Sequence, residues 1–310
     1  MKHFDAAATA AALPFPALID ALARQFVAGC EVPARQVLAV GGELTTLVMP
    51  AWQPGRYFGL KVVHVAPGNS ERGLPGLFAT YQLFDATTGQ PLAAIDGNEI
   101  TARRTAAASA LAASKLARLG ASRLLVVGAG RVARLLAPAY RAALPIEDVM
   151  VWARDPRSAR ALVHDLVAQG IAAQVADDLG AAVAQADIVS CATLATEPLV
   201  QGEWLRAGSH LDLIGSFTPA MREADDACLA GAQVWIDSLE ALSKSGDLLQ
   251  PLASGALARE AVRGTLADLC AHPVPRRDPR ARTVFKSVGT ALEDLAAAVR
   301  VFESGAGRDA

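Results

Sequence analysis

The stretch Arg123–Ala133, RLLVVGAGRVA, decides the fold of this chain. A short apolar run ends in two closely spaced glycines, and a segment with helical character follows. Gly128, Gly130 and Ala133 make a GxGxxA pattern between a predicted strand and a predicted helix, which is typical of a dinucleotide-binding loop. Gly128 would allow the tight turn, Gly130 would let a pyrophosphate approach the backbone, and Ala133 would let the helix pack closely on the sheet. A glycine turn in an unrelated α/β protein is the alternative.

The backbone N–H groups at the start of this helix would hold the phosphates of a dinucleotide. The candidate cofactor ligands in this loop are Gly128, Gly130, Arg131 and Val132.

Strands and helices alternate beyond this loop. Apolar runs typical of strands occur at 149–155, 172–177, 186–193, 209–216 and 232–238, with helical segments between most of them. This alternation is typical of a parallel, doubly wound α/β sheet of the Rossmann type. We therefore expect a dinucleotide-binding domain over residues 119–288.

The remainder of the chain has a different pattern of predicted secondary structure. A helix is expected at 16–28, followed by extended segments at 35–40, 44–52, 56–67, 77–86 and 91–100, which turn residues separate. An alanine-rich helix over about 102–119 and an amphipathic helix over 289–302 complete the pattern. We expect the latter to return to the first domain, so that residues 1–118 and 289–310 form one discontinuous α+β domain.

Composition excludes several classes of function. The 310 residues include 29 Lys and Arg against 31 Asp and Glu, a net charge of −2, which gives no support to a nucleic-acid partner. Hydrophobic residues make up 52%, yet no apolar run approaches the roughly 20 residues needed to cross a bilayer. Asp5, Pro14, Pro16 and Asp20 interrupt the apolar N-terminal segment, so we interpret it as a helix and not as a signal peptide or membrane anchor.

Cysteine and histidine spacing predicts neither a metal site nor a disulfide framework. The chain has no CxxC, HxxxH or HExxH pattern. The four cysteines fit small buried residues in a reducing environment, and a cytoplasmic location is expected. They are Cys30, Cys191, Cys228 and Cys270.

The choice of cofactor depends on the residues where the second strand of the dinucleotide-binding domain ends. An NAD site needs an acidic residue there to accept from the ribose hydroxyl. This chain has Ala153, Arg154 and Asp155. Arg154 could pair with a 2′-phosphate, stack on adenine or be a solvated charge, and Asp155 could bond a ribose hydroxyl. We expect NADP(H) to be preferred and NAD(H) to be accepted.

Lys61 is the unusual residue of the first domain because it lies within the apolar segment FGLKVVHV. A buried ammonium group needs an anion or strong acceptors. The bland alternative is a lysine that snorkels at a sheet edge. Arg35 and the Arg103–Arg104 pair add further cations, so the cluster predicts a small carboxylate substrate.

These segments also resemble a known family. The strings PARQ, GLKVVHVAPGN, ITARRTAAASALAA, VVGAGRVA, HLDLIGSFTPAMRE and VFKSVGTALED occur in order across nearly the whole chain. Together they are similar to the ornithine cyclodeaminase/mu-crystallin family. The resemblance implies a homodimer, a Rossmann domain with a nicotinamide cofactor, and a discontinuous domain for substrate binding and dimerisation.

The resemblance also implies roles for individual residues. Arg35, Lys61 and Arg104 would bind the substrate carboxylate, with Lys61 and Arg104 as the catalytic candidates. Thr80, Phe217, Val288 and Gly289 would line the same pocket. Arg104 and Thr105 would lie near the cofactor, and Thr193 and Ile214 would flank its nicotinamide.

One position departs from the family. Ornithine cyclodeaminases carry an acidic residue for the amine chemistry shortly after the glycine of LIGSFTPAMRE, where this chain has Phe217. Ser216 and Thr218 are poor replacements for a base, and Asp212 lies upstream within the strand. Glu223 falls where the family has a structural acid.

The loss of this acid argues against cyclodeamination but is compatible with reduction of a substrate that already has a C=N bond. The resemblance thus implies an NAD(P)H-dependent ketimine reductase for Δ1-pyrroline-2-carboxylate or Δ1-piperideine-2-carboxylate. Two alternatives stay open at this point. One is an ornithine cyclodeaminase or related amino-acid dehydrogenase, and the other is a crystallin-like protein that binds NADPH without turnover.

Overall fold

The computed structural model describes residues 1–272, 278, 280–305 and 307–309. The chain forms two compact units, residues 1–104 with 290–310 and residues 105–289. The boundary lies inside helix α3 (Gly97–Leu116), whereas the sequence placed it after the alanine-rich helix. The functional roles of the two domains stay a prediction.

The first unit contains a seven-stranded sheet. Strands β2 (Gln36–Gly41) to β6 (Pro91–Asp96) form an antiparallel meander, and each expected extended segment contains a strand. The last segment, expected over 91–100, ends earlier because α3 begins at Gly97. The intervening strands are β3 (Leu44–Gln53), β4 (Tyr57–Val65) and β5 (Leu77–Asp85), with the 3₁₀ helix η1 (Pro67–Arg72) between the last two. Beyond β6, β1 (Lys2–Phe4) pairs in parallel with it and β15 (Arg308–Asp309) pairs antiparallel with β1. Strand β2 therefore forms one open edge of the sheet.

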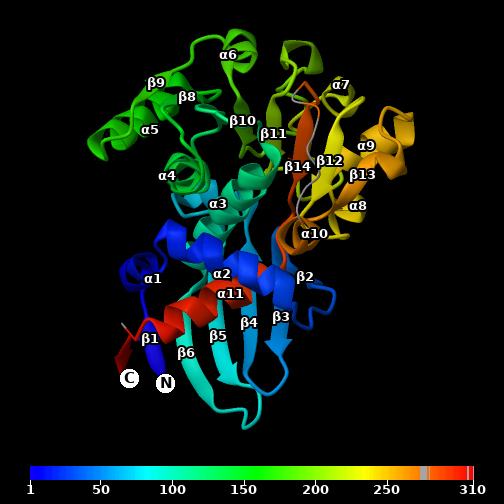
Figure 1. The fold of residues 1–310 in the computed structure, drawn as a ribbon. Helices are drawn as coiled ribbons and strands as arrows, with labels where there is room; N and C mark the ends of the chain where they lie inside the picture. Colours follow the sequence, from blue (N-terminus) through cyan, green and yellow to red (C-terminus); the bar gives the residue numbers. More distant parts are fainter. Residues whose placement is uncertain (273–277, 279, 306, 310) are drawn as a thin grey trace. The chain divides into compact units, whose positions relative to one another are not determined.

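Three helices cover one face of this sheet (Figure 1). They are α1 (Ala6–Ala12), α2 (Phe15–Ala28) and α11 (Ala291–Glu303). The Asp5 side chain caps α1, and a proline in the first turn suits the start of α2. Helix α11, near the end of the chain, packs against α2 and against β3 to β6. The last segment of the chain therefore completes the core of the first unit.

The pleat of the sheet divides its side chains between two faces. Lys61 on β4 lies opposite Tyr81 on β5, and both side chains are buried. The neighbouring residues Phe58, Phe84 and Trp52 belong to the alternate positions and lie on the other face. Lys61 thus points to the face that the helices cover.

No single helix in the described residues is long and apolar enough to cross a membrane. Among the helices that the structure describes, α1 and α2 alone reach that length and composition when taken together, and they are bent by 74° where they meet.

The second unit is a doubly wound sheet of eight parallel strands, which confirms the predicted fold class. Its order is β13-β12-β14-β11-β10-β7-β8-β9. The strands are β7 (Arg123–Val127), β8 (Asp148–Trp152), β9 (Ala173–Val175), β10 (Ile188–Cys191), β11 (His210–Leu213), β12 (Gln233–Ile236), β13 (Val262–Thr265) and β14 (Thr283–Lys286). The order of β7 to β11 is the one in which a nucleotide binds at the carboxyl ends of the strands, where the order reverses between β7 and β10.

Helices and short 3₁₀ turns connect these strands. They are α4 (Ala133–Ala143), α5 (Pro156–Ala168), α6 (Leu179–Gln185), α7 (Asp226–Leu229), α8 (Ala241–Lys244), α9 (Gly246–Ser254), α10 (Leu266–Ala271), η2 (Gly202–Trp204) and η3 (Arg259–Ala261). Sequence analysis assigned no strand to 262–265 or to 283–286. The second of these, β14, is fully buried between β11 and β12.

Candidate functional site

The glycine loop joins β7 to α4 as its sequence predicts. Gly128 has a φ of 116°, and a Cβ there would lie 2.6 Å from the carbonyl oxygen of Ala192. Only glycine fits both that backbone conformation and that close approach. A Cβ at Gly130 would meet no atom within 4 Å. The protein therefore leaves open space beside Gly130, where the sequence predicts the approach of a pyrophosphate.

The backbone at this loop also offers unused donors. In the described part of the chain, no hydrogen bond occupies the N–H groups of Gly130, Arg131 and Val132. These groups precede α4, whose N-terminal end favours an anion. The loop therefore fits the phosphates of a dinucleotide.

The end of β8 carries the residues that would distinguish NAD from NADP. Asp155 caps α5, because its Oδ1 accepts from the Arg157 N–H at 3.0 Å and its Oδ2 accepts from the Ser158 hydroxyl at 3.2 Å. The backbone N–H of Arg157 holds the pKa of Asp155 below its ordinary value. Arg154 is exposed and forms no ion pair within the described residues. Asp155 thus has a structural task, and Arg154 is available to a ligand.

Glu223 joins the loops that follow β10 and β11. Its Oε1 accepts from the Thr193 N–H at 2.7 Å and from the Thr193 hydroxyl at 2.8 Å, and its Oε2 accepts from the Gly215 N–H at 2.6 Å. Burial raises the pKa of Glu223 to about 7, and Lys286 opposes that shift. Ile214 directly precedes Gly215 in the sequence and is mostly buried. Glu223 therefore holds the backbone of two loops at the ends of β10 and β11.

A second buried carboxylate, Asp237, holds the Val288–Gly289 turn. Its Oδ2 accepts from the Val288 N–H at 2.8 Å and from the Gly289 N–H at 2.6 Å. Burial raises the pKa of Asp237. The turn assigned to the substrate pocket is therefore fixed through its backbone.

Lys286, at the end of β14, is fully buried. Its ammonium donates to the Leu213 carbonyl at 2.9 Å and lies 3.6 Å from the Asp247 carboxylate. Asp247 in turn accepts from the Glu223 N–H at 2.8 Å. This network fixes the carboxyl ends of β11 and β14.

In the first unit, Lys61 and Arg104 form a buried charge cluster with two acids of α11. The Lys61 ammonium lies 2.6 Å from Asp294 Oδ2. Arg104 Nε lies 2.9 Å from Asp294 Oδ1, and Arg104 Nη1 lies 2.6 Å from Glu293 Oε2. All four side chains are almost inaccessible to water. We call these four residues the buried charge cluster.

Arg35 extends the positive charge beside this cluster. It is partly buried just before β2 and lies near enough to depress the pKa of Lys61. Three cations therefore lie near one another in the first unit. Ammonium and guanidinium groups of this kind can bind a carboxylate ligand.

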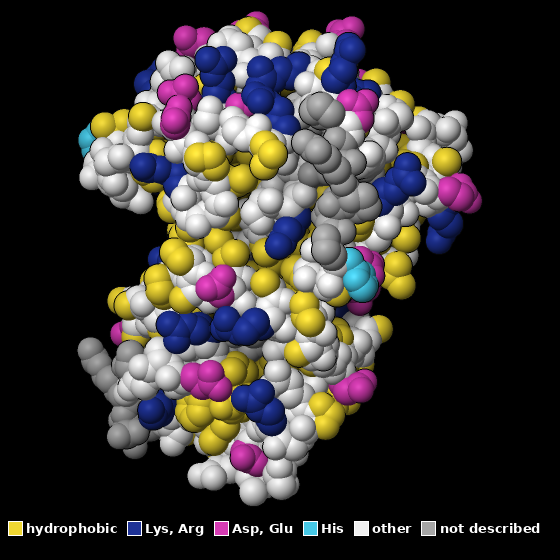
Figure 2. All heavy atoms as spheres, viewed as in Figure 1, with side chains coloured by type: hydrophobic (Ala, Val, Ile, Leu, Met, Phe, Trp, Pro, Cys, Tyr) yellow, Lys and Arg dark blue, Asp and Glu magenta, His cyan; other side chains and the backbone are white. Residues whose placement is uncertain are grey.

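The surface charge on the displayed face does not indicate a second binding site for an anionic ligand. Figure 2 shows basic and acidic side chains interspersed on the face that it displays, with no broad field of one sign. Within the described residues, no group of three or more His, Cys, Asp or Glu side chains could hold a metal ion.

Other predicted residues lie in different surroundings. Thr80 pairs with Val62, so the pleat places it on the sheet face opposite Lys61, and it is exposed. A single copy of the chain thus does not bring Thr80 beside Lys61, and the role of Thr80 in the substrate pocket stays a prediction. Thr105, the residue after Arg104 in α3, is buried.

Two polar neighbours of Phe217 in the sequence, Ser216 and Asp212, are engaged in hydrogen bonds inside the protein. The Phe217 ring is 41% exposed. Ser216 is buried and donates to the Met221 carbonyl at 2.6 Å. Asp212 lies inside β11 and accepts from the hydroxyls of Ser109, Tyr140 and Ser190, while burial raises its pKa to about 6. Neither Ser216 nor Asp212 is free to act on an amine.

Sequence analysis missed several charged residues that organise these sites. They are Asp237, Asp247, Lys286, Glu293 and Asp294. Lys286 gives the same signal as Lys61, a lysine inside an apolar run, and that signal would have revealed it.

Comparisons with known proteins agree with the family resemblance of the sequence segments described above. The model of the ornithine cyclodeaminase/mu-crystallin family matches residues 17–308. A Δ1-pyrroline-2-carboxylate reductase from Paracoccus denitrificans is 46% identical over 256 residues, which cover 81% of this chain and 80% of that protein.

Two solved structures share the fold over almost the whole chain. One is the Thermococcus litoralis Δ1-pyrroline-2-carboxylate reductase in complex with NADH and L-proline, with a TM-score of 0.94, 30% identity and complete coverage of both chains. The other is an archaeal alanine dehydrogenase dimer with bound NAD, with a TM-score of 0.91, 28% identity, and coverage of 98% of this chain and 96% of that one.

The glycine loop generates a matched pair of variants. Gly130→Ala should leave the free energy of unfolding within about 0.5 kcal/mol of the parent, because the new methyl group meets no protein atom. It should weaken NADPH binding at least about tenfold by blocking the phosphates. Urea unfolding and titration of cofactor fluorescence would measure the two effects.

Gly128→Ala is the control, and it should destabilise the fold by about 1–3 kcal/mol because its methyl group meets the Ala192 carbonyl. Unchanged cofactor affinity in Gly130→Ala would contradict the assignment of this loop.

Proposed function

Because the chain belongs to the ornithine cyclodeaminase/mu-crystallin family, we propose that it is an NAD(P)H-dependent reductase of a cyclic ketimine carboxylate. The substrate is Δ1-pyrroline-2-carboxylate or Δ1-piperideine-2-carboxylate, and the product is the L-imino acid. The observation that carries this proposal is Phe217, which stands where cyclodeaminases need an acid. Reduction of an existing C=N bond does not need that acid.

Arg35 and the two cations of the buried charge cluster bind the substrate. The charged groups of Arg35, Lys61 and Arg104 attract its carboxylate, and charge-assisted hydrogen bonds fix the plane of the ring. Orientation of this kind lowers a reaction barrier by several kcal/mol. Because the carboxylate is bonded to the imine carbon, holding it also positions the carbon that is reduced.

The nicotinamide cofactor supplies a hydride when it is bound. The glycine loop holds the phosphates, and Glu223 holds the Thr193 and Gly215 segments on the nicotinamide side. The imine nitrogen also needs a proton, which comes either from water or from the Lys61 ammonium. Burial lowers the pKa of Lys61 to about 8, close to the pH at which such a proton donor works best.

Turnover of purified protein tests this function. Each cyclic imino acid should oxidise NADPH, followed at the absorbance of the reduced cofactor, with L-proline or L-pipecolate as the product and no release of ammonia. Parallel reactions with L-ornithine and NAD should release no ammonia, because Phe217 can neither accept a proton nor orient an amine.

Two other results of these assays would indicate a different function for the chain. Ammonia and proline from ornithine would establish a cyclodeaminase and overturn the interpretation of Phe217. NADPH binding without either reaction would favour the crystallin-like alternative.

NADPH is the cofactor that we propose as preferred. Arg154 is exposed, is unpaired within the described residues and follows β8 at the position that contacts the adenosine ribose in this fold. Its guanidinium can bond a 2′-phosphate, while Asp155 is engaged as the cap of α5.

Arg154→Ala should therefore lower kcat/KM for NADPH about tenfold and change kcat/KM for NADH little, since an exposed charge-assisted contact contributes about 1.5 kcal/mol. Arg157→Ala, at another exposed arginine of the same segment, is the matched control and should change neither. Equal losses with both cofactors in Arg154→Ala would remove Arg154 from 2′-phosphate recognition.

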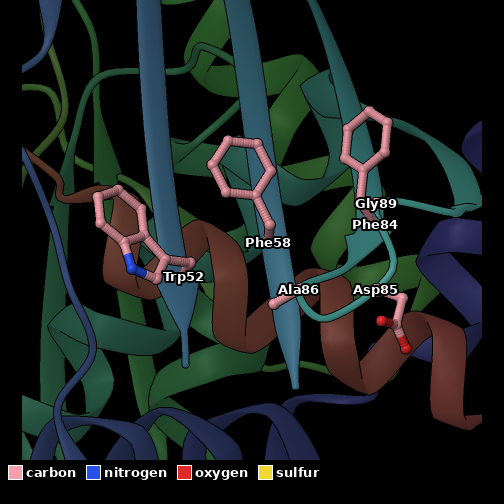
Figure 3. A pocket seen from close by; sticks show the side chains of 6 residues that line it. All are labelled: Trp52, Phe58, Phe84, Asp85, Ala86 and Gly89. Carbon is pink, nitrogen blue, oxygen red and sulfur yellow. The ribbon is translucent and has the colours of Figure 1, made fainter. Parts of the chain in front are cut away.

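A homodimer is the assembly that we propose, formed through the sheet of the first unit. Strand β2 is an open edge and is exposed along its whole length, including Val37, Leu38 and Val40. On the face opposite α11, the rings of Trp52, Phe58 and Phe84 lie in a row on neighbouring strands beside a hollow of about 390 Å³ (Figure 3). Open edges and apolar patches of this kind are typical of interfaces.

Two variants test that interface. The parent should sediment at twice the 32.1 kDa chain mass. Leu38→Glu should shift it toward the monomer because it places a charge in the proposed interface. Val167→Glu, at an equally exposed position on α5 of the second unit, should not. A parent of single-chain mass, or a dimer unaffected by Leu38→Glu, would contradict the proposal.

A further inference from the structure

Asp294 holds two of the three cations that are assigned to the substrate carboxylate. Each of its two oxygens pairs with a different cation. Oδ2 lies 2.6 Å from the Lys61 ammonium, and Oδ1 lies 2.9 Å from Arg104 Nε. The carboxylate is fully buried, so water does not compete for these contacts. Asp294 therefore fixes where both cations lie.

The surroundings of Lys61 make this contact decisive. Burial, together with repulsion from Arg104 and Arg35, lowers the pKa of Lys61 from 10.5 to about 8. Asp294 is the group that opposes them. Burial alone would raise the pKa of Asp294, but Lys61 and Arg104 outweigh that effect and hold it below its usual value. Both partners are therefore charged at neutral pH.

The titratable and charged groups around Lys61 come from every neighbouring element. Those on α11 are Asp294 and Glu293, α3 contributes Arg104, the segment before β2 contributes Arg35, β5 contributes Tyr81, and the end of α2 is followed by Cys30. Burial raises the pKa values of Tyr81 and Cys30, so both are neutral over the range in which Lys61 titrates. Within the described residues, Asp294 alone makes a direct ion pair with Lys61.

We propose that Asp294 is a positioning residue that keeps Lys61 charged and aimed, and thereby sets the upper limit of the pH range in which the protein binds its carboxylate substrate. This inference rests on the function proposed above, because it takes Lys61 to be a ligand of that carboxylate. The direction of the pH dependence of binding follows from the charge of lysine, which is positive only when the amine is protonated. Binding is retained below the pKa of Lys61 and is lost as the pH rises through it.

Glu293 offers a matched comparison next to Asp294. Glu293 also lies on α11 and is also buried, but its ion pair is with Arg104. A guanidinium stays protonated at every pH at which the fold persists. Loss of Glu293 therefore weakens binding by the same factor at all pH values, whereas loss of Asp294 weakens it increasingly as the pH rises.

The first experiment observes Lys61 directly and needs no turnover. The chain has only five lysines, so NMR of protein labelled with ¹³C at the lysine ε-carbons is readable, and Lys61→Arg assigns the Lys61 signal. Asp294→Asn should lower the pKa of Lys61 by at least about one unit, because it removes the opposite charge. Glu293→Gln should leave that pKa within a few tenths of the parent value.

The second experiment measures kcat/KM for the cyclic imino acid across pH. The alkaline limb of the profile should begin near pH 8 in the parent, move down by the same amount as the NMR pKa in Asp294→Asn, and stay in place in Glu293→Gln. Ionisation of the free substrate is common to all variants and cancels in the comparison.

Lys61→Arg keeps the proposal testable if Asp294→Asn does not accumulate as folded protein. An arginine can pair with Asp294 and does not lose its proton, so the alkaline limb should disappear. A limb that persists unchanged in Lys61→Arg overturns the proposal. So does an Asp294→Asn protein that loses activity equally at every pH, or a pKa of Lys61 that responds equally to loss of either acid.

Failure of the proposed function gives a different result. In that case the parent does not reduce cyclic imines, while the NMR comparison of Asp294→Asn with Glu293→Gln still decides whether Asp294 controls the charge of Lys61.

Discussion

Two cations lie in the core of the first unit because two carboxylates of one helix lie beside them. Moving an ammonium and a guanidinium out of water costs several kcal/mol for each ion, and only close partners offset that cost. Asp294 and Glu293 are those partners, and α11 carries both. The fold of the first unit and its chemistry therefore depend on the same helix, which comes from the far end of the chain.

The second unit uses buried carboxylates differently. Glu223 and Asp237 accept hydrogen bonds from backbone N–H groups of segments that follow the strands. Each carboxylate thereby fixes loop backbone at the end of the sheet where a doubly wound fold binds its nucleotide. Buried acid therefore stabilises cations in the first unit and loop backbone in the second.

Sequence alone predicted the fold class, the glycine loop and the exceptional character of Lys61, because each depends on a local pattern. The acids of α11 were missed for the opposite reason. A helical pattern assigns adjacent acidic residues to a polar face, and their partners Lys61 and Arg104 lie about 190 or more positions away in the chain. Strand β14 was missed because it is only four residues long. The face of the sheet on which Thr80 lies could not be predicted either, since the pairing of Lys61 with Tyr81 depends on a register that neither strand reveals by itself.

The two buried lysines of apolar strands show why the same sequence signal supports different conclusions. The buried charged groups around Lys286 are acids, namely Asp247, Glu223, Asp237 and Asp212, and its ammonium also donates to a carbonyl. Such a lysine is satisfied by the protein itself. Lys61 instead has Arg104 and Arg35 nearby, and both destabilise its charged form. Crowding of like charges in a core opposes folding unless anions relieve it. This repulsion from Arg104 and Arg35, more than the burial of Lys61, indicates that the arrangement suits an anionic ligand.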